Sequence, residues 1–74
     1  MNSIKRLRIK NGYTQQEVAK KIGITQKSVS LYERNLNTPT AKNLMKLSKL
    51  FGITVDELLS DYTLETPKRL DKQT

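Results

Sequence analysis

Residues 25–34 carry a group of polar side chains whose types suit hydrogen bonding to an anionic partner. At 100° per residue of a helix, Val29 and Tyr32 fall on one side, so the outer side is mostly polar. Amide, ammonium, hydroxyl and guanidinium groups there can contact base edges and phosphates, and Leu31 can add one apolar contact. A solvated face is the alternative interpretation, and an exposed leucine weighs against it. The outer residues are Lys27, Ser30, Leu31 and Arg34, beside Gln26 at the helix start.

Helices must position these side chains, because the apolar spacing is helical along the chain and no period-two run predicts a strand pair. Thr14 with Glu17, and Thr54 with Glu57, have the spacing of capping boxes at two helix starts. The expected helices span about residues 3–11, 14–22, 26–34, 40–51 and 54–60. Their inward residues are expected to be Ile4, Leu7, Val18, Ala19, Ile22, Val29, Tyr32, Leu44, Leu47, Leu50, Val55, Leu58 and Leu59.

The second and third of these helices are joined by a very short corner, Gly23-Ile24. Two helices connected by a short turn that contains glycine are typical of a helix-turn-helix. Ala19 is small where the two helices would approach each other, and Ile24 can fill the corner between them. Ordinary helical hairpins share these features, so the corner predicts a geometry and leaves the partner open.

The composition restricts the classes of function. The 74 residues include no Cys and no His, so the chain lacks a disulfide, a thiolate metal site and a histidine base. We therefore expect no enzyme, no metal and no other cofactor. No segment approaches the roughly 20 apolar residues of a membrane span, and the N-terminus lacks the apolar core of a signal peptide. We expect a cytoplasmic protein without a membrane partner.

Positive charge is concentrated in the first part of the chain, which has a formal net charge of +7. Residues 1–52 carry eleven Lys and Arg against Glu17 and Glu33, whereas residues 53–74 carry three against five acids. Each phosphate neutralised by Lys or Arg releases condensed counterions, so the basic part suits a nucleic acid. A lysine-rich soluble surface is the alternative. A membrane-surface helix is disfavoured, because no segment pairs a wide apolar face with a basic one.

A series of short motifs over about residues 4–59 resembles the lambda-repressor-like, Cro/C1-type helix-turn-helix regulators. The motifs are Leu7-Arg8, Gly12-Tyr13-Thr14-Gln15, Glu17-Val18-Ala19, Ile22-Gly23-Ile24, Ser28-Val29-Ser30, Tyr32-Glu33, Pro39-Thr40, Leu50-Phe51-Gly52-Ile53 and Asp56-Glu57-Leu58-Leu59. The resemblance implies an all-α, five-helix domain that binds double-stranded operator DNA, usually as a homodimer. The leading hypothesis is a regulator of transcription, a repressor or an activator, and of these we favour the repressor. We expect residues 1–60 to form this domain and residues 61–74 to form a polar, mostly mobile tail.

The resemblance also assigns roles to individual residues. Gln26, Lys27 and Leu31 fall where the family reads bases, with Ser28 as a fourth candidate. Gln15 falls where the family contacts a phosphate and supports the third helix. Further phosphate contacts are implied for Thr25, Ser30, Arg34, Asn37, Thr40 and Lys42.

The resemblance also implies one internal contact, and the sequence departs from the family at two positions. Arg8 and Glu33 fall at positions that form an ion pair between the first and third helices. Asn35 replaces the glycine that usually follows the third helix, and asparagine is the next-best residue in left-handed geometry. Ile9, usually polar in the family, would face a dimer partner or the tail. The expected dimer interface, which could instead close the monomer core, consists of Leu58, Leu59, Tyr62 and Leu64.

Other functions use the same fold. An antitoxin or a restriction-modification controller would also bind its own promoter, and the sequence does not separate them from a repressor. A protein-interaction module that has lost DNA binding is disfavoured, because the outer face of the third helix has no acid. We expect no second, ligand-sensing domain and no small-molecule ligand, and a location on the nucleoid.

Overall fold

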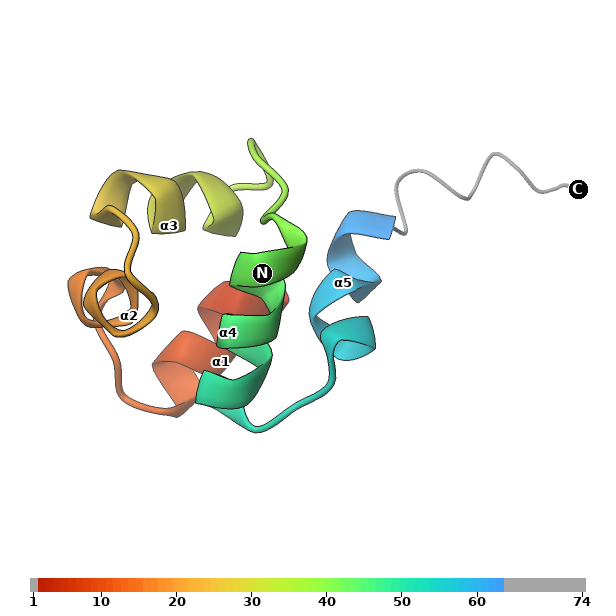
Figure 1. The fold of residues 1–74 in the computed structure, drawn as a ribbon, viewed down its shortest axis with the longest axis horizontal. Coiled ribbons are helices and arrows are strands. Elements are labelled where there is room, and N and C mark those ends of the chain that lie inside the picture. Colours follow the sequence, from red (N-terminus) through yellow and green to blue (C-terminus); the bar gives the residue numbers. More distant parts are fainter. Residues whose placement is uncertain (1, 64–74) are drawn as a thin grey trace, which may run out of the picture.

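The computed structural model describes the backbone of residues 2–63 and the side chains of residues 2–59. This part of the chain folds into five helices and contains no strand, so the all-α class expected from the sequence is observed (Figure 1). None of these helices is both long and apolar enough to cross a bilayer. The helices are α1 (Ser3–Lys10), α2 (Gln15–Ile22), α3 (Gln26–Glu33), α4 (Ala41–Phe51) and α5 (Val55–Thr63).

Side-chain caps begin the helices. Each cap residue of the first four helices accepts a hydrogen bond from the backbone N–H three residues later, at 3.0–3.2 Å. Such a cap satisfies one of the unpaired N–H groups of the first turn and is worth about 1 kcal/mol. Both predicted capping boxes are present, with Glu17 and Glu57 accepting in return from the backbone of Thr14 and Thr54. The four caps are Asn2, Thr14, Thr25 and Thr40.

The first four helices also end in one common way. A residue with left-handed backbone follows each helix, and the next N–H donates to the carbonyl five residues earlier, at 2.9–3.1 Å. Three of these left-handed residues are glycines, and the fourth is Asn35 with φ 59°. Asn35 is the one non-glycine residue with positive φ in the described range, which confirms the expectation for this corner.

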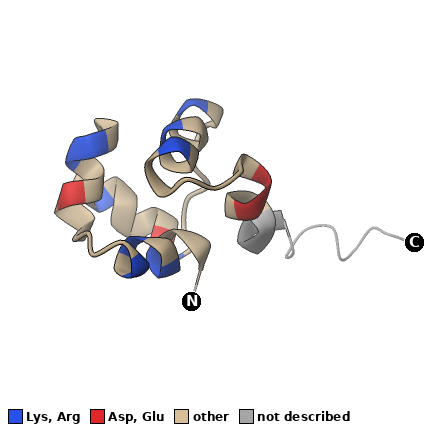
Figure 2. Cartoon of the chain, turned by 90° about the horizontal axis from the view of Figure 1, so that it is seen from below, with Lys and Arg blue, Asp and Glu red and all other residues tan. Residues whose placement is uncertain are grey.

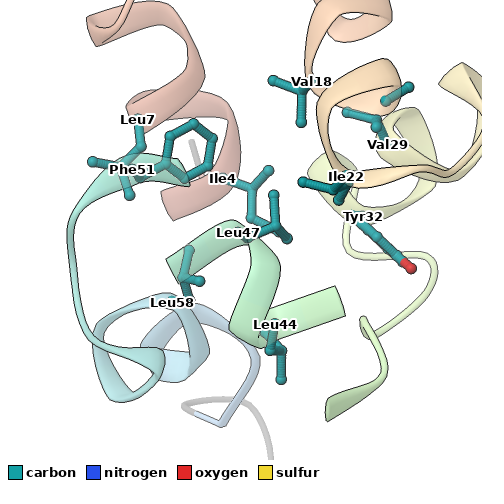
Figure 3. Packing of buried hydrophobic residues seen from close by; sticks show 11 residues of the cluster. Ile4, Leu7, Val18, Ile22, Val29, Tyr32, Leu44, Leu47, Phe51 and Leu58 are labelled. Carbon is teal, nitrogen blue, oxygen red and sulfur yellow. The ribbon is translucent and has the colours of Figure 1, made fainter. Parts of the chain in front are cut away.

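The core lies between all five helices and is filled by eleven apolar residues (Figure 3). On α4 the buried residues are Leu44, Leu47 and Phe51, whereas Leu50, expected inside, is only partly buried. Phe51 lies about 20° from Leu44 around the helix axis, and Leu50 lies about 120° away. The predicted stripe of three leucines therefore leaves the inner face at its last member, and Phe51 takes its place.

Helix α5 closes the monomer core. Leu58 is 0% exposed, so its prediction as a dimer-interface residue is wrong and the alternative role in the core is observed. Leu59 is partly buried and packs against the same cluster. The helix continues to Thr63, past the expected boundary at residue 60, because no glycine or proline interrupts it there. The Tyr62 side chain and residues 64–74, with Leu64 and most of the expected tail, lie outside the described residues.

Candidate nucleic-acid interface

The corner between α2 and α3 is fixed from both sides. Gly23 has φ 77°, and the Ile24 N–H donates to the Ala19 carbonyl at 2.9 Å. Ala19 is 3% exposed and Ile24 packs against the core, as the sequence predicted. From α4, Lys46 Nζ donates to the carbonyl of Ile22 at 3.2 Å and so satisfies the last turn of α2. These contacts set the direction in which α3 leaves α2.

Helix α3 lies at the edge of the molecule and presents one face to solvent (Figure 1). Val29 and Tyr32 are 1% and 7% exposed and face the core. Gln26, Lys27 and Arg34 are exposed, and Ser28 is half-buried. The other predicted contact residues that are exposed lie at or beyond the two ends of α3, namely Thr25, Asn37, Thr40 and Lys42.

Two outer residues of α3 are less accessible than the sequence suggested. Ser30 and Leu31 are half-buried. The chain turns back directly after α3, and the N–H groups of Leu36 and Asn37 donate to the Leu31 carbonyl at 2.9 and 3.4 Å. Arg34 Nε donates to the Ser30 carbonyl at 3.4 Å. Leu31 therefore offers a smaller apolar surface than a fully exposed leucine would.

The N-terminal turn of α3 is organised by hydroxyl groups. Thr25 Oγ1 accepts from the Ser28 N–H at 3.1 Å and also donates to Ser28 Oγ at 3.0 Å. The Ser28 hydroxyl can still donate its own proton to an acceptor outside the protein. Gln26 and Lys27 follow the cap directly, so the exposed amide and ammonium groups stand at the end of the helix where the macrodipole is positive. This end is suited to an anionic surface.

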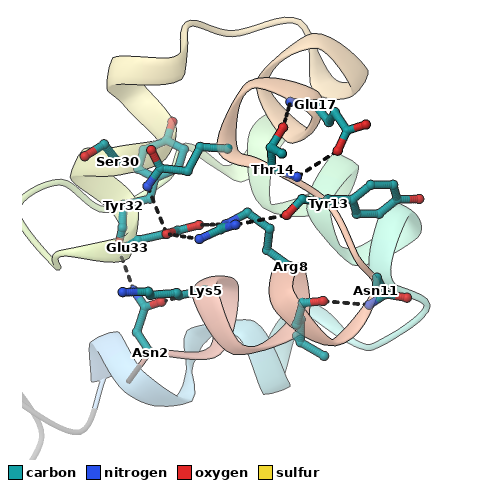
Figure 4. Close-up of polar contacts among 12 residues, drawn as sticks. Asn2, Lys5, Arg8, Asn11, Tyr13, Thr14, Glu17, Ser30, Tyr32 and Glu33 are labelled. Atoms are coloured by element: carbon teal, nitrogen blue, oxygen red, sulfur yellow. Dashed lines mark hydrogen bonds and ion pairs between the residues drawn. The ribbon is translucent and has the colours of Figure 1, made fainter.

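An ion pair between Arg8 and Glu33 links α1 to α3 (Figure 4). Arg8 Nε and Nη2 donate to the two carboxylate oxygens of Glu33 at 2.6 and 3.2 Å, and Nη1 donates to the Tyr13 carbonyl at 2.9 Å. Gln15 Nε2, from α2, donates to Glu33 Oε1 at 3.1 Å. The structure thus brings Arg8, Glu33 and Gln15 together, and Gln15 supports α3 through this contact.

The C-terminal end of α3 is held by a residue that the sequence interpretation missed. Asn2 is 6% exposed, and its Nδ2 donates to the Tyr32 carbonyl at 2.6 Å and to Asn35 Oδ1 at 3.0 Å. Asn43 Nδ2, from α4, donates to the Tyr32 hydroxyl at 3.0 Å. Asparagine ahead of a predicted helix is a cap signal that could have identified Asn2. No local pattern predicts its contacts with α3.

Charge is distributed unevenly over the described helices (Figure 2). Lys and Arg occur on α1 to α4 or directly after them, and the first turn of α5 carries Asp56 and Glu57. Glu33 is the acid of α3, and it is 8% exposed and paired with Arg8. The solvent face of α3 therefore presents Lys27, with Arg34 directly after the helix, and no exposed acid on this helix. The described residues contain no cluster of three acidic, His or Cys side chains that could hold a metal ion.

Comparisons with known proteins agree with this geometry. The family model described as helix-turn-helix matches residues 4–58. The transcriptional regulator ImmR of Bacillus subtilis is 43% identical over 56 residues, which cover 76% of this chain and 44% of ImmR. The antitoxin HipB of Escherichia coli K12 is 35% identical over 72 residues, which cover 97% of this chain and 80% of HipB. This chain thus spans less than half the length of ImmR.

A solved structure shows the same fold. The N-terminal DNA binding domain of SinR from Bacillus subtilis superposes with a TM-score of 0.70 at 38% identity, covering 77% of this chain and 84% of that domain. The family match extends from α1 into α5 and includes the corner between α2 and α3. The chain therefore belongs to the helix-turn-helix family, in its lambda-repressor-like, Cro/C1-type branch.

Proposed function

We propose that this chain is a transcriptional regulator, acting as a repressor, that binds a specific double-stranded DNA operator and places α3 in the major groove. The observation that carries the proposal is the solvent face of α3, where Gln26 and Lys27 are exposed at the N-terminal end while Glu33 is buried against Arg8. Burial of that carboxylate removes the acid that would repel phosphates. The solved relative described as a DNA binding domain and the regulator ImmR support the same role.

Within this role, the candidate DNA-contacting residues divide by position. The N-terminal part of α3 enters the groove most deeply in helix-turn-helix proteins, so Gln26 and Lys27 are proposed to contact bases, with Ser28 and Leu31 beside them. The ends of the helix and the start of α4 are proposed to face the phosphate backbone of the duplex. Phosphate contacts are proposed for Gln15, Thr25, Ser30, Arg34, Asn37, Thr40 and Lys42.

The operator is found by selecting binding sites from random duplexes and footprinting the selected sequence. On that operator, Lys27→Ala is expected to cost about 1–3 kcal/mol of binding free energy, and less on a duplex changed at the base pair that Lys27 reads. Arg34→Ala is expected to weaken all duplexes alike and to lower the slope of log K against log salt by about one unit. Binding isotherms over a salt series measure both effects.

Lys49→Ala is the matched control for these two variants, because Lys49 is an exposed lysine at the opposite end of α4 from the α3–α4 loop. It should leave affinity and discrimination close to those of the wild type. Equal losses on matched and mismatched duplexes for Lys27→Ala, with a reduced salt slope, would make Lys27 a phosphate contact. Base reading would then rest on Gln26, Ser28 and Leu31.

The operator is expected to contain two half-sites related by pseudo-two-fold symmetry, because one recognition helix contacts too few base pairs to select a site in a genome. A homodimer would then bind with the half-site centres roughly 34 Å apart, one turn of the duplex. Exposed apolar residues available for the dimer contact are Ile9 and Met45, at 52% and 57% exposure. A footprint of a single unpaired half-site at saturation would contradict the dimer.

A second candidate role is that of an antitoxin that represses its own promoter. The similarity to HipB favours it, since the match covers 97% of this chain and 80% of that antitoxin. A toxin encoded by the adjacent gene would co-purify with this protein in the antitoxin case and would be absent for a stand-alone repressor. Both roles are non-enzymatic, need no cofactor or small-molecule ligand, and place the protein on the nucleoid in the cytoplasm.

A further inference from the structure

We propose that Asn2 is a positioning residue for DNA binding. It holds the C-terminal end of α3 and thereby orients Arg34 and the residues near it that are proposed to contact DNA phosphates. The proposal rests on the DNA-binding function proposed above. It concerns a side chain that precedes the first helix and makes its contacts about 30 residues further along the chain.

The Asn2 amide uses both of its donor hydrogens and its oxygen within the protein. Oδ1 accepts from the Lys5 N–H at 3.0 Å and caps α1. Nδ2 donates one hydrogen to the Tyr32 carbonyl at 2.6 Å and the other to Asn35 Oδ1 at 3.0 Å. An amide has two donor hydrogens, so both are engaged at the end of α3. Asn2 therefore joins the start of α1 to the corner after α3 and is itself buried.

The corner that Asn2 holds differs from the other three. The other helix ends place glycine in the left-handed position, whereas this one places Asn35 there with φ 59°. A side chain in this conformation is disfavoured sterically, and a local hydrogen bond offsets part of the cost. The same corner is closed by the Asn35 N–H, which donates to the Tyr32 carbonyl at 3.1 Å. Asn2 thus bonds to both residues of that closing hydrogen bond.

The residues on either side of this corner are those proposed to contact phosphates. Arg34 directly precedes Asn35, and Asn37 follows two residues later, with its N–H 3.4 Å from the Leu31 carbonyl. Both side chains are exposed. If the corner loosens, the Arg34 guanidinium loses its fixed direction while Gln26 and Lys27, at the other end of α3, keep theirs. Loss of the Asn2 side chain should therefore weaken the contacts with DNA phosphates and leave discrimination between bases unchanged.

Asn2→Ser tests this inference, because serine is a good helix cap but cannot reach Tyr32 and Asn35 with two donors. On the selected operator, Asn2→Ser is expected to lower the salt slope by about one unit, as Arg34→Ala does, with the ratio of affinities for matched and mismatched duplexes unchanged. In an Arg34→Ala background the further change in slope should disappear, because the two residues act through one contact. Asn11→Ser is the control, since Asn11 Nδ2 bonds to the Leu7 carbonyl at the end of α1, away from α3.

Asn35→Gly removes only one of the two bonds, so it is no substitute for Asn2→Ser. If Asn2→Ser does not fold, Asn2→Asp replaces it, because aspartate caps a helix and lacks both amide donors. A salt slope equal to that of the wild type in folded Asn2→Ser or Asn2→Asp would overturn the inference and leave the proposed function intact. A wild-type protein that selects no duplex would instead overturn the proposed function, and this inference with it.

Discussion

Replacing Arg8 by Met or Glu33 by Gln is expected to lower the free energy of unfolding by about 3–5 kcal/mol, because each change leaves one buried group without its charged partner. The side chains of Arg8 and Glu33 are 13% and 2% exposed. After Arg8→Met, the hydrogen bond from Gln15 remains on the Glu33 carboxylate. After Glu33→Gln, the guanidinium keeps the Tyr13 carbonyl. Against a total of roughly 5–15 kcal/mol for a typical domain, either loss is large.

Urea melts followed by circular dichroism measure this effect. Arg6→Met is the matched control, because Arg6 is an exposed arginine on the same helix; its midpoint should stay close to that of the wild type. The double variant Arg8→Met/Glu33→Gln should recover part of the loss, since no uncompensated charge stays buried. Identical midpoints for Arg6→Met and Arg8→Met would show that the ion pair contributes nothing to stability.

Leu58→Ala is expected to cost about 2–5 kcal/mol, because it leaves a cavity at a fully buried position of the core. For a domain of this size, each kcal/mol shifts the melting temperature by roughly 4–8 °C, so the variant should melt at least about 8 °C lower. Calorimetry measures the shift. Leu36→Ala, at a leucine that is 61% exposed in the turn after α3, is the matched control and should change the melting temperature little.

The same variant distinguishes the two roles that the sequence left open for Leu58. A residue of the monomer core lowers the melting temperature at every protein concentration. An interface residue would instead change the mass measured by light scattering and would leave a monomer of normal stability. The second outcome would contradict the buried position of Leu58 in α5.

Local signals explain why much of the fold could be predicted. Helix caps and helix ends use contacts between residues three to five positions apart. The capping box of Thr14 with Glu17 and the corner at Gly23 can therefore be predicted from the sequence. The period of 3.6 residues likewise places Val29 and Tyr32 inside. The same period, counted from Leu44, also favours Phe51 over Leu50 as the last inward residue of α4, so the predicted stripe of three leucines followed residue type where the geometry already pointed to Phe51.

The candidate site was predictable to a smaller extent. Exposure of Gln26 and Lys27 follows from their position opposite the inner face of α3, but half-burial of Leu31 depends on the path of the loop after the helix. The contacts of Asn2 with Tyr32 and Asn35 join residues that are 30 and 33 positions apart in the sequence. Side-chain contacts of this kind arise from tertiary packing and leave no periodic pattern. The Arg8–Glu33 pair was accessible only through the family resemblance.

Because α3 is short, DNA binding depends on the stability of the whole fold. The helix has eight residues, whereas an isolated helix needs about 12–15 residues to be even marginally stable in water. Its shape therefore depends on Val29 and Tyr32 remaining docked in the core. A chain that unfolds loses its recognition surface at the same moment, and an operator that binds only the native chain pulls the folding equilibrium toward it by mass action. Occupancy of the operator and persistence of the native state are thus coupled variables, and warming acts on both together.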